Sequence, residues 1–155
     1  MRHEDRITAR RQLDKRLDLL RNSDALTHPP RGWIKAIREA LGMTTAQLGA
    51  RIGVSQPRAV AIEKAEVQGT ITLNSLERAA RALDCQFVYA VIPRKPLEKL
   101  IEERAHLVAK QRLESTRHSM ALEAQVVDKL DENKQRKRLA QRLIEKASEL
   151  WEEDA

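Results

Sequence analysis

The chain has 155 residues, 34% of them charged and only 3% aromatic, which is expected of one small domain with an extension and a modest aliphatic core. A net charge of +6, from 29 Lys and Arg against 23 Asp and Glu, favours a polyanionic partner such as nucleic acid. A single cysteine, no apolar run of the roughly 18 residues that span a bilayer and no secretory-type apolar start indicate a cytoplasmic protein without a membrane partner.

Two helices are expected before the central part of the chain. An apolar stripe runs along residues 4–22, formed by Ile7, Leu13, Leu17 and Leu20. Pro29 and Pro30 end that segment and favour an extended connection. Residues 31–41 then predict the first core helix, which Gly42 ends. Its apolar side comprises Trp33, Ile34, Ile37 and Leu41.

The most specific pattern is TTAQLGARIGVSQPRAVAI at residues 44–62. Thr44 and Gln47 have the spacing of a capping box. Gly53 permits the positive φ of a tight turn, and Ser55 can cap the helix that follows. Small or apolar residues recur at the spacing that two crossed helices bury: Leu48, Gly49, Ile52, Val54, Ala59 and Ile62. The pattern predicts a helix-turn-helix, whose second helix usually enters the major groove of double-stranded DNA.

After this motif we expect a loop at residues 66–71 and a helix capped by Thr72, followed by a β-strand at residues 85–92. Side chains would alternate along the strand, with Phe87, Tyr89 and Val91 on one side and Val88, Ala90 and Ile92 on the other. A lone strand leaves its backbone N–H and C=O groups unpaired. Because the chain offers no second strand of this quality, we predict a homodimer in which two copies pair this strand antiparallel across a two-fold axis.

From Pro96 onward the sequence contains neither glycine nor proline. Apolar residues cluster at the two ends of this tail, at Leu97, Leu100, Ile101 and Val108, and at Leu139, Leu143, Ala147 and Leu150. Residues 131–138 between them have none. One long helix would expose both apolar stripes, so we expect two helices that fold back on each other or pack on a partner.

The helix-turn-helix pattern resembles that of the Xre-type, phage-repressor-like family, although Ala65 and Glu66 stand where most members have a glycine. Nearly the whole chain resembles the family called mobile mystery protein A. The resemblance covers GWIKAIREALGMTTAQLGARIGVSQPRAVAIEKAE, TLNSLERAARALDCQFVYAVIP and the helical tail. This resemblance implies a small DNA-binding regulator encoded beside a Fic-domain protein. The expected fold is mainly α: a phage-repressor-like bundle at residues 29–93 that includes the strand, between an N-terminal helix and linker at 1–28 and a helical extension at 94–155.

Residues at the start of the second helix would reach furthest into the groove. The candidates for base reading are Gln56, Pro57, Arg58, Val60 and Ala61. Gln56 can bond adenine, Arg58 can bond guanine or grip a phosphate, and Val60 can touch a thymine methyl or pack internally. The candidates for phosphate contact are Thr44, Thr45, Gln47, Arg51, Ser55 and Lys64. Arg51 and Lys64 could equally be ordinary solvated side chains.

We therefore expect a homodimeric transcriptional regulator, an antitoxin-like autorepressor that reads a palindromic operator. The alternative is an interaction module whose helical tail binds and neutralises the neighbouring Fic-domain protein. We expect no enzyme, cofactor or metal, because the four histidines are scattered. Glu103 and His106 have the spacing of one half of a di-iron site, but the sequence has no second Glu-x-x-His pair to complete it. We expect Cys85 to be a small apolar residue that fills space in the core.

Overall fold

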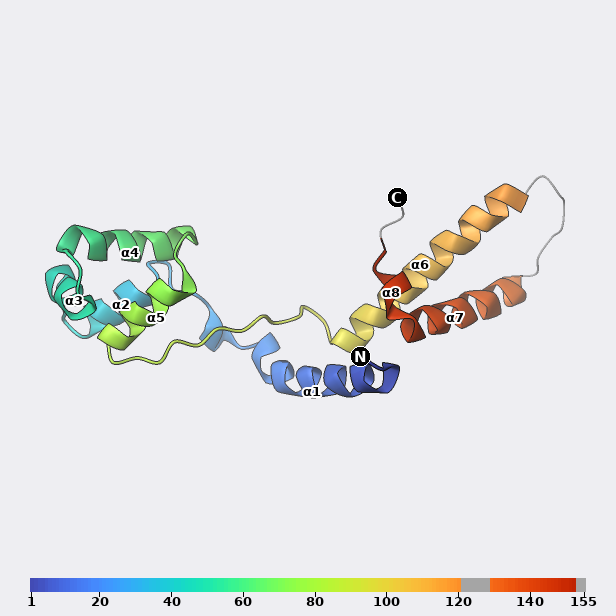
Figure 1. The fold of residues 1–155 in the computed structure, drawn as a ribbon, viewed down its shortest axis with the longest axis horizontal. Coiled ribbons are helices and arrows are strands. Elements are labelled where there is room, and N and C mark those ends of the chain that lie inside the picture. The colour runs from blue at the N-terminus through green and yellow to red at the C-terminus, as the bar shows by residue number, and fades with distance from the viewer. Residues whose placement is uncertain (121–128, 153–155) are drawn as a thin grey trace. The chain divides into compact units, whose positions relative to one another are not determined.

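The computed structural model describes residues 1–120 and 129–152. Its contacts divide the chain into two units (Figure 1). One unit is the continuous segment Ser23–Val91, and the other joins Met1–Asn22 to the chain from Ile92 onward. Residues 1–22 thus belong with the C-terminal helices.

The unit at Ser23–Val91 is a small helical bundle. It contains the 3-10 helix η1 (Asp24–Leu26) and the α-helices α2 (Trp33–Ala40), α3 (Thr45–Ile52), α4 (Gln56–Gln68) and α5 (Leu73–Ala82). The four α-helices, together with Leu83 directly after α5, supply one apolar core. Its buried residues are Ile34, Leu48, Ile62, Ala79, Ala82 and Leu83. The predicted bundle around the turn is therefore confirmed. The expectation that Trp33 and Leu41 face its core was wrong, since they are 40% and 59% exposed.

Helix α4 is longer than the sequence analysis predicted. We expected a loop from residue 66, but the helix continues to Gln68, and Gly69 ends it with φ of 70°. Within this longer helix the Glu66 side chain is buried, and it accepts the backbone N–H groups of Trp33 at 2.8 Å and Ile34 at 3.0 Å. These N–H groups begin α2 and lack helical partners, so Glu66 caps a neighbouring helix from the last turns of its own.

Residues 85–92, predicted to be a strand, form neither a helix nor a strand, and no strand occurs in the described residues. The prediction of a strand is not supported within one chain, because a strand needs partner N–H and C=O groups and none of the described segments supplies them. The rings of Phe87 and Tyr89 nevertheless stack, with centroids 6.2 Å apart. Side chains two residues apart therefore share one side, as they do in an extended backbone.

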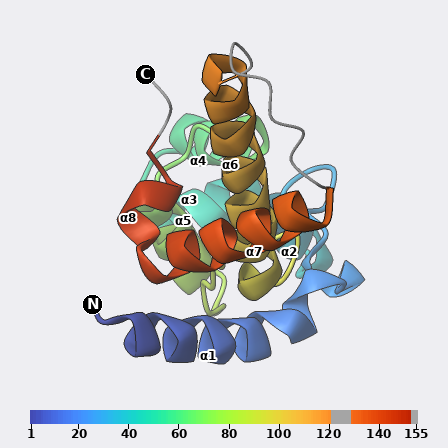
Figure 2. The ribbon, with the colours of Figure 1, turned by 90° about the vertical axis from the view of Figure 1, so that its right-hand side faces the viewer.

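The other unit contains α1 (His3–Arg21), α6 (Leu97–Met120), α7 (Lys129–Glu145) and the short α8 (Ala147–Leu150). Helices α6 and α7 pack against each other (Figure 2). The core of this unit, to which α8 also contributes, consists of Ala105, Val108, Ala109, Ala140, Leu143 and Leu150. The tail thus folds back on itself, as expected. None of the described helices is long and apolar enough to cross a membrane.

Charged side chains join α1 to the beginning of α6. Arg10 Nε donates to Glu98 Oε2 at 2.8 Å, and this bond lowers the pKa of the Glu98 carboxyl. The Asp14 carboxylate accepts the backbone N–H of Leu97 at 2.7 Å, so an α1 side chain caps α6. Arg21 donates to Pro93 O at 3.2 Å. Within this unit, Arg21 at the end of α1 and Pro93 ahead of α6 therefore lie side by side.

Candidate nucleic-acid interface

The start of α3 is held by a reciprocal pair of hydrogen bonds. Thr44 Oγ1 accepts the backbone N–H of Gln47 at 3.2 Å, and the Gln47 side-chain oxygen accepts the N–H of Thr44 at 2.8 Å. This is the capping box that the sequence predicts. Both side chains are exposed, and the N-terminus of α3 faces solvent beside them.

The turn after α3 depends on two glycines. Gly53 has φ of 84° and ψ of 34°, the left-handed conformation that ends a helix without cost for glycine alone. Gly49 is buried, and its carbonyl accepts the N–H groups of Gly53 at 2.9 Å and Val54 at 2.8 Å. A Cβ at Gly49 would lie 2.9 Å from Val54 O and 3.2 Å from Ser55 O. The backbone of the turn therefore lies directly on α3, where no side chain fits.

Helix α4 begins at the predicted position and presents its first turn to solvent. Ser55 Oγ accepts the N–H of Arg58 at 3.4 Å, and Pro57 occupies the first turn, where its missing N–H costs nothing. Gln56, Pro57 and Arg58 are exposed. On the same helix Ala61 is also exposed and Val60 is half-buried, whereas Ala59, Ile62, Glu63 and Glu66 form the buried face.

A buried ion pair fixes α4 from behind. The Arg38 guanidinium of α2 donates through Nε and Nη2 to the two carboxylate oxygens of Glu63, and through Nη1 to Met43 O at 2.8 Å. The hydrogen bond to Glu63 raises the pKa of Arg38 against the opposing effect of burial. Because Met43 precedes α3, one side chain joins α2, α4 and the segment that leads into α3. This arrangement holds α3 and α4 in one orientation.

The sequence analysis missed this pair, although a signal was present. Glu63 and Glu66 follow Ala59 and Ile62 at the three- and four-residue spacing of one helix face. The predicted apolar pattern ends at Ile62. Two acidic residues that continue a buried stripe require buried donors, and Arg38 and the N-terminus of α2 supply them.

The residues predicted to contact phosphate occupy different surroundings. Thr44, Gln47, Ser55 and Lys64 are exposed, and Thr45 is half-buried. Arg51 has an internal partner, because its Nε donates to Ala82 O at the end of α5. The structure therefore gives Arg51 a packing role between α3 and α5, while Lys64 on α4 remains a solvent-facing cation. Thr44, Gln47 and Ser55 flank the exposed first turns of α3 and α4.

The groups considered for metal binding are dispersed. Within residues 1–120 and 129–152 no three His, Cys, Asp or Glu side chains are close enough to hold a metal ion together. Glu103 accepts a hydrogen bond from Lys95 at 2.7 Å. Cys85 is half-buried and contacts Leu83 O at 3.4 Å.

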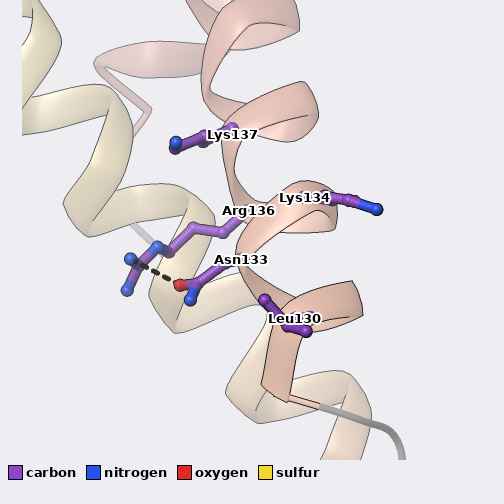
Figure 3. A pocket seen from close by; sticks show the side chains of 5 residues that line it. All are labelled: Leu130, Asn133, Lys134, Arg136 and Lys137. Carbon is purple, nitrogen blue, oxygen red and sulfur yellow. Dashed lines mark hydrogen bonds between the residues drawn. The ribbon is translucent and has the colours of Figure 1, made fainter.

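A surface hollow beside α7 carries mainly basic and polar groups (Figure 3). It is lined by Leu130, Asn133, Lys134, Arg136 and Lys137. Arg136 donates to Asn133 Oδ1 at 3.0 Å, while Lys134 points outward along the helix surface. Among the described residues, no carboxylate, histidine or cysteine lines this hollow.

Comparison with known families identifies the bundle. Residues 34–89 match the helix-turn-helix family HTH_3, of the Xre type. The comparisons with curated proteins and with solved structures gave no significant match. The matched range runs from the first turn of α2 to Tyr89 and so includes α3, α4 and the turn between them. The chain therefore contains a helix-turn-helix domain, which indicates a DNA-binding regulator.

Proposed function

We propose that the protein is a sequence-specific transcriptional regulator that reads operator DNA with the first turn of α4. The observation that carries this proposal is the contrast between the two faces of that helix. Gln56, Pro57 and Arg58 are exposed at its start, whereas Glu63 and Glu66 are locked into the bundle. A reading helix needs both properties, because base contacts demand a rigid support and free side chains.

Within this proposal Gln56 bonds the N6 and N7 atoms of adenine, and Arg58 forks onto O6 and N7 of guanine. Thr44, Thr45, Gln47, Ser55 and Lys64 contact the phosphate backbone, aided by the N-terminus of α3. Ala61 and the exposed part of Val60 complete the surface that faces the bases. Binding weakens steeply as the salt concentration rises, because each neutralised phosphate releases counterions.

The regulator acts as a homodimer on a palindrome whose half-sites lie about one helical turn apart. Support for a dimer comes from the segment at 85–92, whose Val88, Tyr89 and Val91 are 73%, 68% and 83% exposed. Large apolar side chains so open to water favour a partner surface. The simplest regulatory outcome is repression of the protein's own promoter, as the resemblance to mobile mystery protein A implies.

Selection of bound sequences from a random DNA pool tests base reading directly. With the selected operator, Arg58→Ala should lose about 1–3 kcal/mol, or roughly 5- to 150-fold in affinity, at one base pair and retain normal discrimination elsewhere. Arg81→Ala is the matched control, since Arg81 is an exposed arginine of α5 that pairs with Glu77. A uniform loss across operator variants would make Arg58 a phosphate contact. Unchanged binding by both Arg58→Ala and Gln56→Ala would refute the proposal.

A second function is favoured by the unit built from α1, α6, α7 and α8. It has its own core and exposes Leu107, Leu130 and Trp151, which are 48%, 68% and 57% exposed. We propose that this unit binds a protein partner, for which the resemblance suggests the neighbouring Fic-domain protein. Copurification of the two gene products tests this. Leu107→Glu with Trp151→Glu should abolish copurification and leave operator binding intact. Copurification that survives both changes would exclude this surface.

A further inference from the structure

The extended segment after α5, residues 86–92, has well-defined ends. At its start, Asp84 adopts φ of 58° and the Cys85 N–H donates to Ala80 O at 2.9 Å, so this amide still belongs to the end of α5. At its other end, Pro93 has no N–H and its carbonyl accepts from Arg21. Among the described residues, no hydrogen bond engages the backbone of residues 86–92. Within the part of the chain that the structure describes, these seven consecutive residues therefore have unpaired backbone N–H and C=O groups.

Symmetry limits how two copies of this segment can pair. Successive side chains of a strand point to opposite faces, and residues directly opposite each other share a face. A two-fold axis through an antiparallel ribbon must therefore pass between a residue and its own copy. Any other placement would require neighbouring residues to lie on the same face. Only an axis at the central residue of 86–92 pairs all seven residues, and that residue is Tyr89.

We infer that two copies of the chain pair residues 86–92 antiparallel with Tyr89 opposite Tyr89 on the two-fold axis. This inference rests on the homodimer of the proposed function and specifies its interface. Phe87 of one copy lies opposite Val91 of the other on the face that also carries Tyr89. On the other face Val88 lies opposite Ala90. Aromatic and β-branched residues placed directly opposite each other stabilise a ribbon.

A second copy fits this segment better than a partner of another kind because the segment complements itself. The stacked rings of Phe87 and Tyr89 leave Tyr89 68% exposed, and Val91 on the same side is 83% exposed. In the inferred register Val91 of each copy lies opposite Phe87 of the other copy and covers its ring. Gln86 of one copy then lies opposite Ile92 of the other at both ends of the ribbon. Cys85 and Pro93 flank the paired residues 86–92.

Cysteine cross-linking of the full chain tests the register. The chain has one cysteine, so Cys85→Ala gives a background without thiols. Into it are placed Tyr89→Cys, Val88→Cys or Ala90→Cys, and disulfide formation is followed in a glutathione redox buffer. Tyr89→Cys should cross-link at least about tenfold faster than either neighbour alone, because opposite residues lie within disulfide reach and diagonal ones do not. An equimolar mixture of Val88→Cys and Ala90→Cys should form the mixed dimer.

Tyr89→Cys removes the tyrosine ring, so a second measurement tests the same contact in the protein that retains it. Tyr89 is the only tyrosine of the chain, so photo-oxidation of the unaltered protein should yield dityrosine through this residue alone. Fastest cross-linking at Val88→Cys or Ala90→Cys alone, without dityrosine, would overturn the register while leaving the dimer. A dimer by mass with no cross-link at any position would place the interface elsewhere. Operator binding by the Cys85→Ala protein is measured in parallel, and its absence would refute the regulator independently.

Discussion

Replacing Gly49 with alanine adds one methyl group where the structure has no room for it. The new Cβ would lie 2.9 Å from Val54 O, 3.2 Å from Ser55 O and 3.3 Å from Ser55 C. These are backbone atoms, so rotation of a side chain cannot relieve the contact. The turn must move away from α3, and the start of α4 must move with it.

The expected cost follows from two opposing effects. Overpacking of a close contact costs about 1–3 kcal/mol, whereas alanine in place of glycine stabilises a helix interior by up to about 1 kcal/mol. Because the contact is with backbone atoms, we expect a net loss of about 1–2 kcal/mol. For a unit of this size such a loss lowers the melting temperature by roughly 5–15 °C.

Tryptophan fluorescence can follow this unit separately. The chain has two tryptophans, so a Trp151→Phe background leaves Trp33 of α2 as the only reporter. In that background Gly49→Ala should unfold at the lower temperature and, while still folded, bind operator DNA more weakly. An unchanged or higher melting temperature would refute the close approach of the turn to α3.

Gly69→Ala separates instability from misplacement of the reading helix. Gly69 ends α4 with φ of 70°, and nothing lies within 4 Å of a Cβ there. Alanine in this left-handed conformation should cost about 1–2 kcal/mol. Because the change lies at the opposite end of α4 from Gln56, affinity for the operator should stay unchanged. Equal losses of affinity in both variants would mean that stability alone controls binding.

Three further outcomes follow from buried and capping charges. Arg38→Met should destabilise the bundle by about 3–5 kcal/mol by leaving a buried carboxylate without its cation, and adding Glu63→Leu should restore most of that loss in a denaturant titration. Asp14→Ala should cost about 0.5–2 kcal/mol and speed hydrogen exchange in the first turn of α6. Glu98 has a lowered pKa in the folded state, so its contribution to stability is present at neutral pH and is lost as the pH falls through that lowered value. Glu98→Gln should remove this acid dependence from the unfolding curve.

The first two of these outcomes can fail in distinct ways. A double variant of Arg38 and Glu63 that stays as unstable as Arg38→Met would mean that packing, not charge, sets the cost. Unchanged exchange rates in Asp14→Ala would show that solvent caps α6 equally well. Asp18→Ala is its control, since Asp18 lies on α1 and pairs with Arg21 without capping α6.

Local chemistry explains why the motif could be predicted from sequence. The capping box of Thr44 and Gln47, the left-handed Gly53 and the cap at Ser55 each depend on residues within four positions of one another. Such features can be predicted because the residues that form them are neighbours in the sequence. The buried position of Gly49 was also predicted, and its nearest neighbours are backbone atoms of the turn at Val54 and Ser55.

What the sequence analysis missed depends on partners far along the chain. The role of Glu66 requires the N-terminus of α2, 32 residues away, and Asp14 caps a helix that begins 83 residues later. No local pattern identifies such partners. The strand at 85–92 failed for a related reason: its alternation was real, as the stacked Phe87 and Tyr89 show, but a strand is a property of a pair.

The proposal that α4 reads DNA has to account for the two carboxylates on the buried face of this helix. The charge of Glu63 is matched by Arg38 in direct contact, and that of Glu66 by two N–H groups at the positive end of α2. Neither charge is left to repel phosphate, so Arg58 and Lys64 determine the local field on the exposed face. Their partners also restrain α4 at two points along its length, two and three turns beyond Gln56. In the proposed regulator, replacing either carboxylate by an isosteric amide should therefore perturb base reading, because α4 loses a contact that fixes its position.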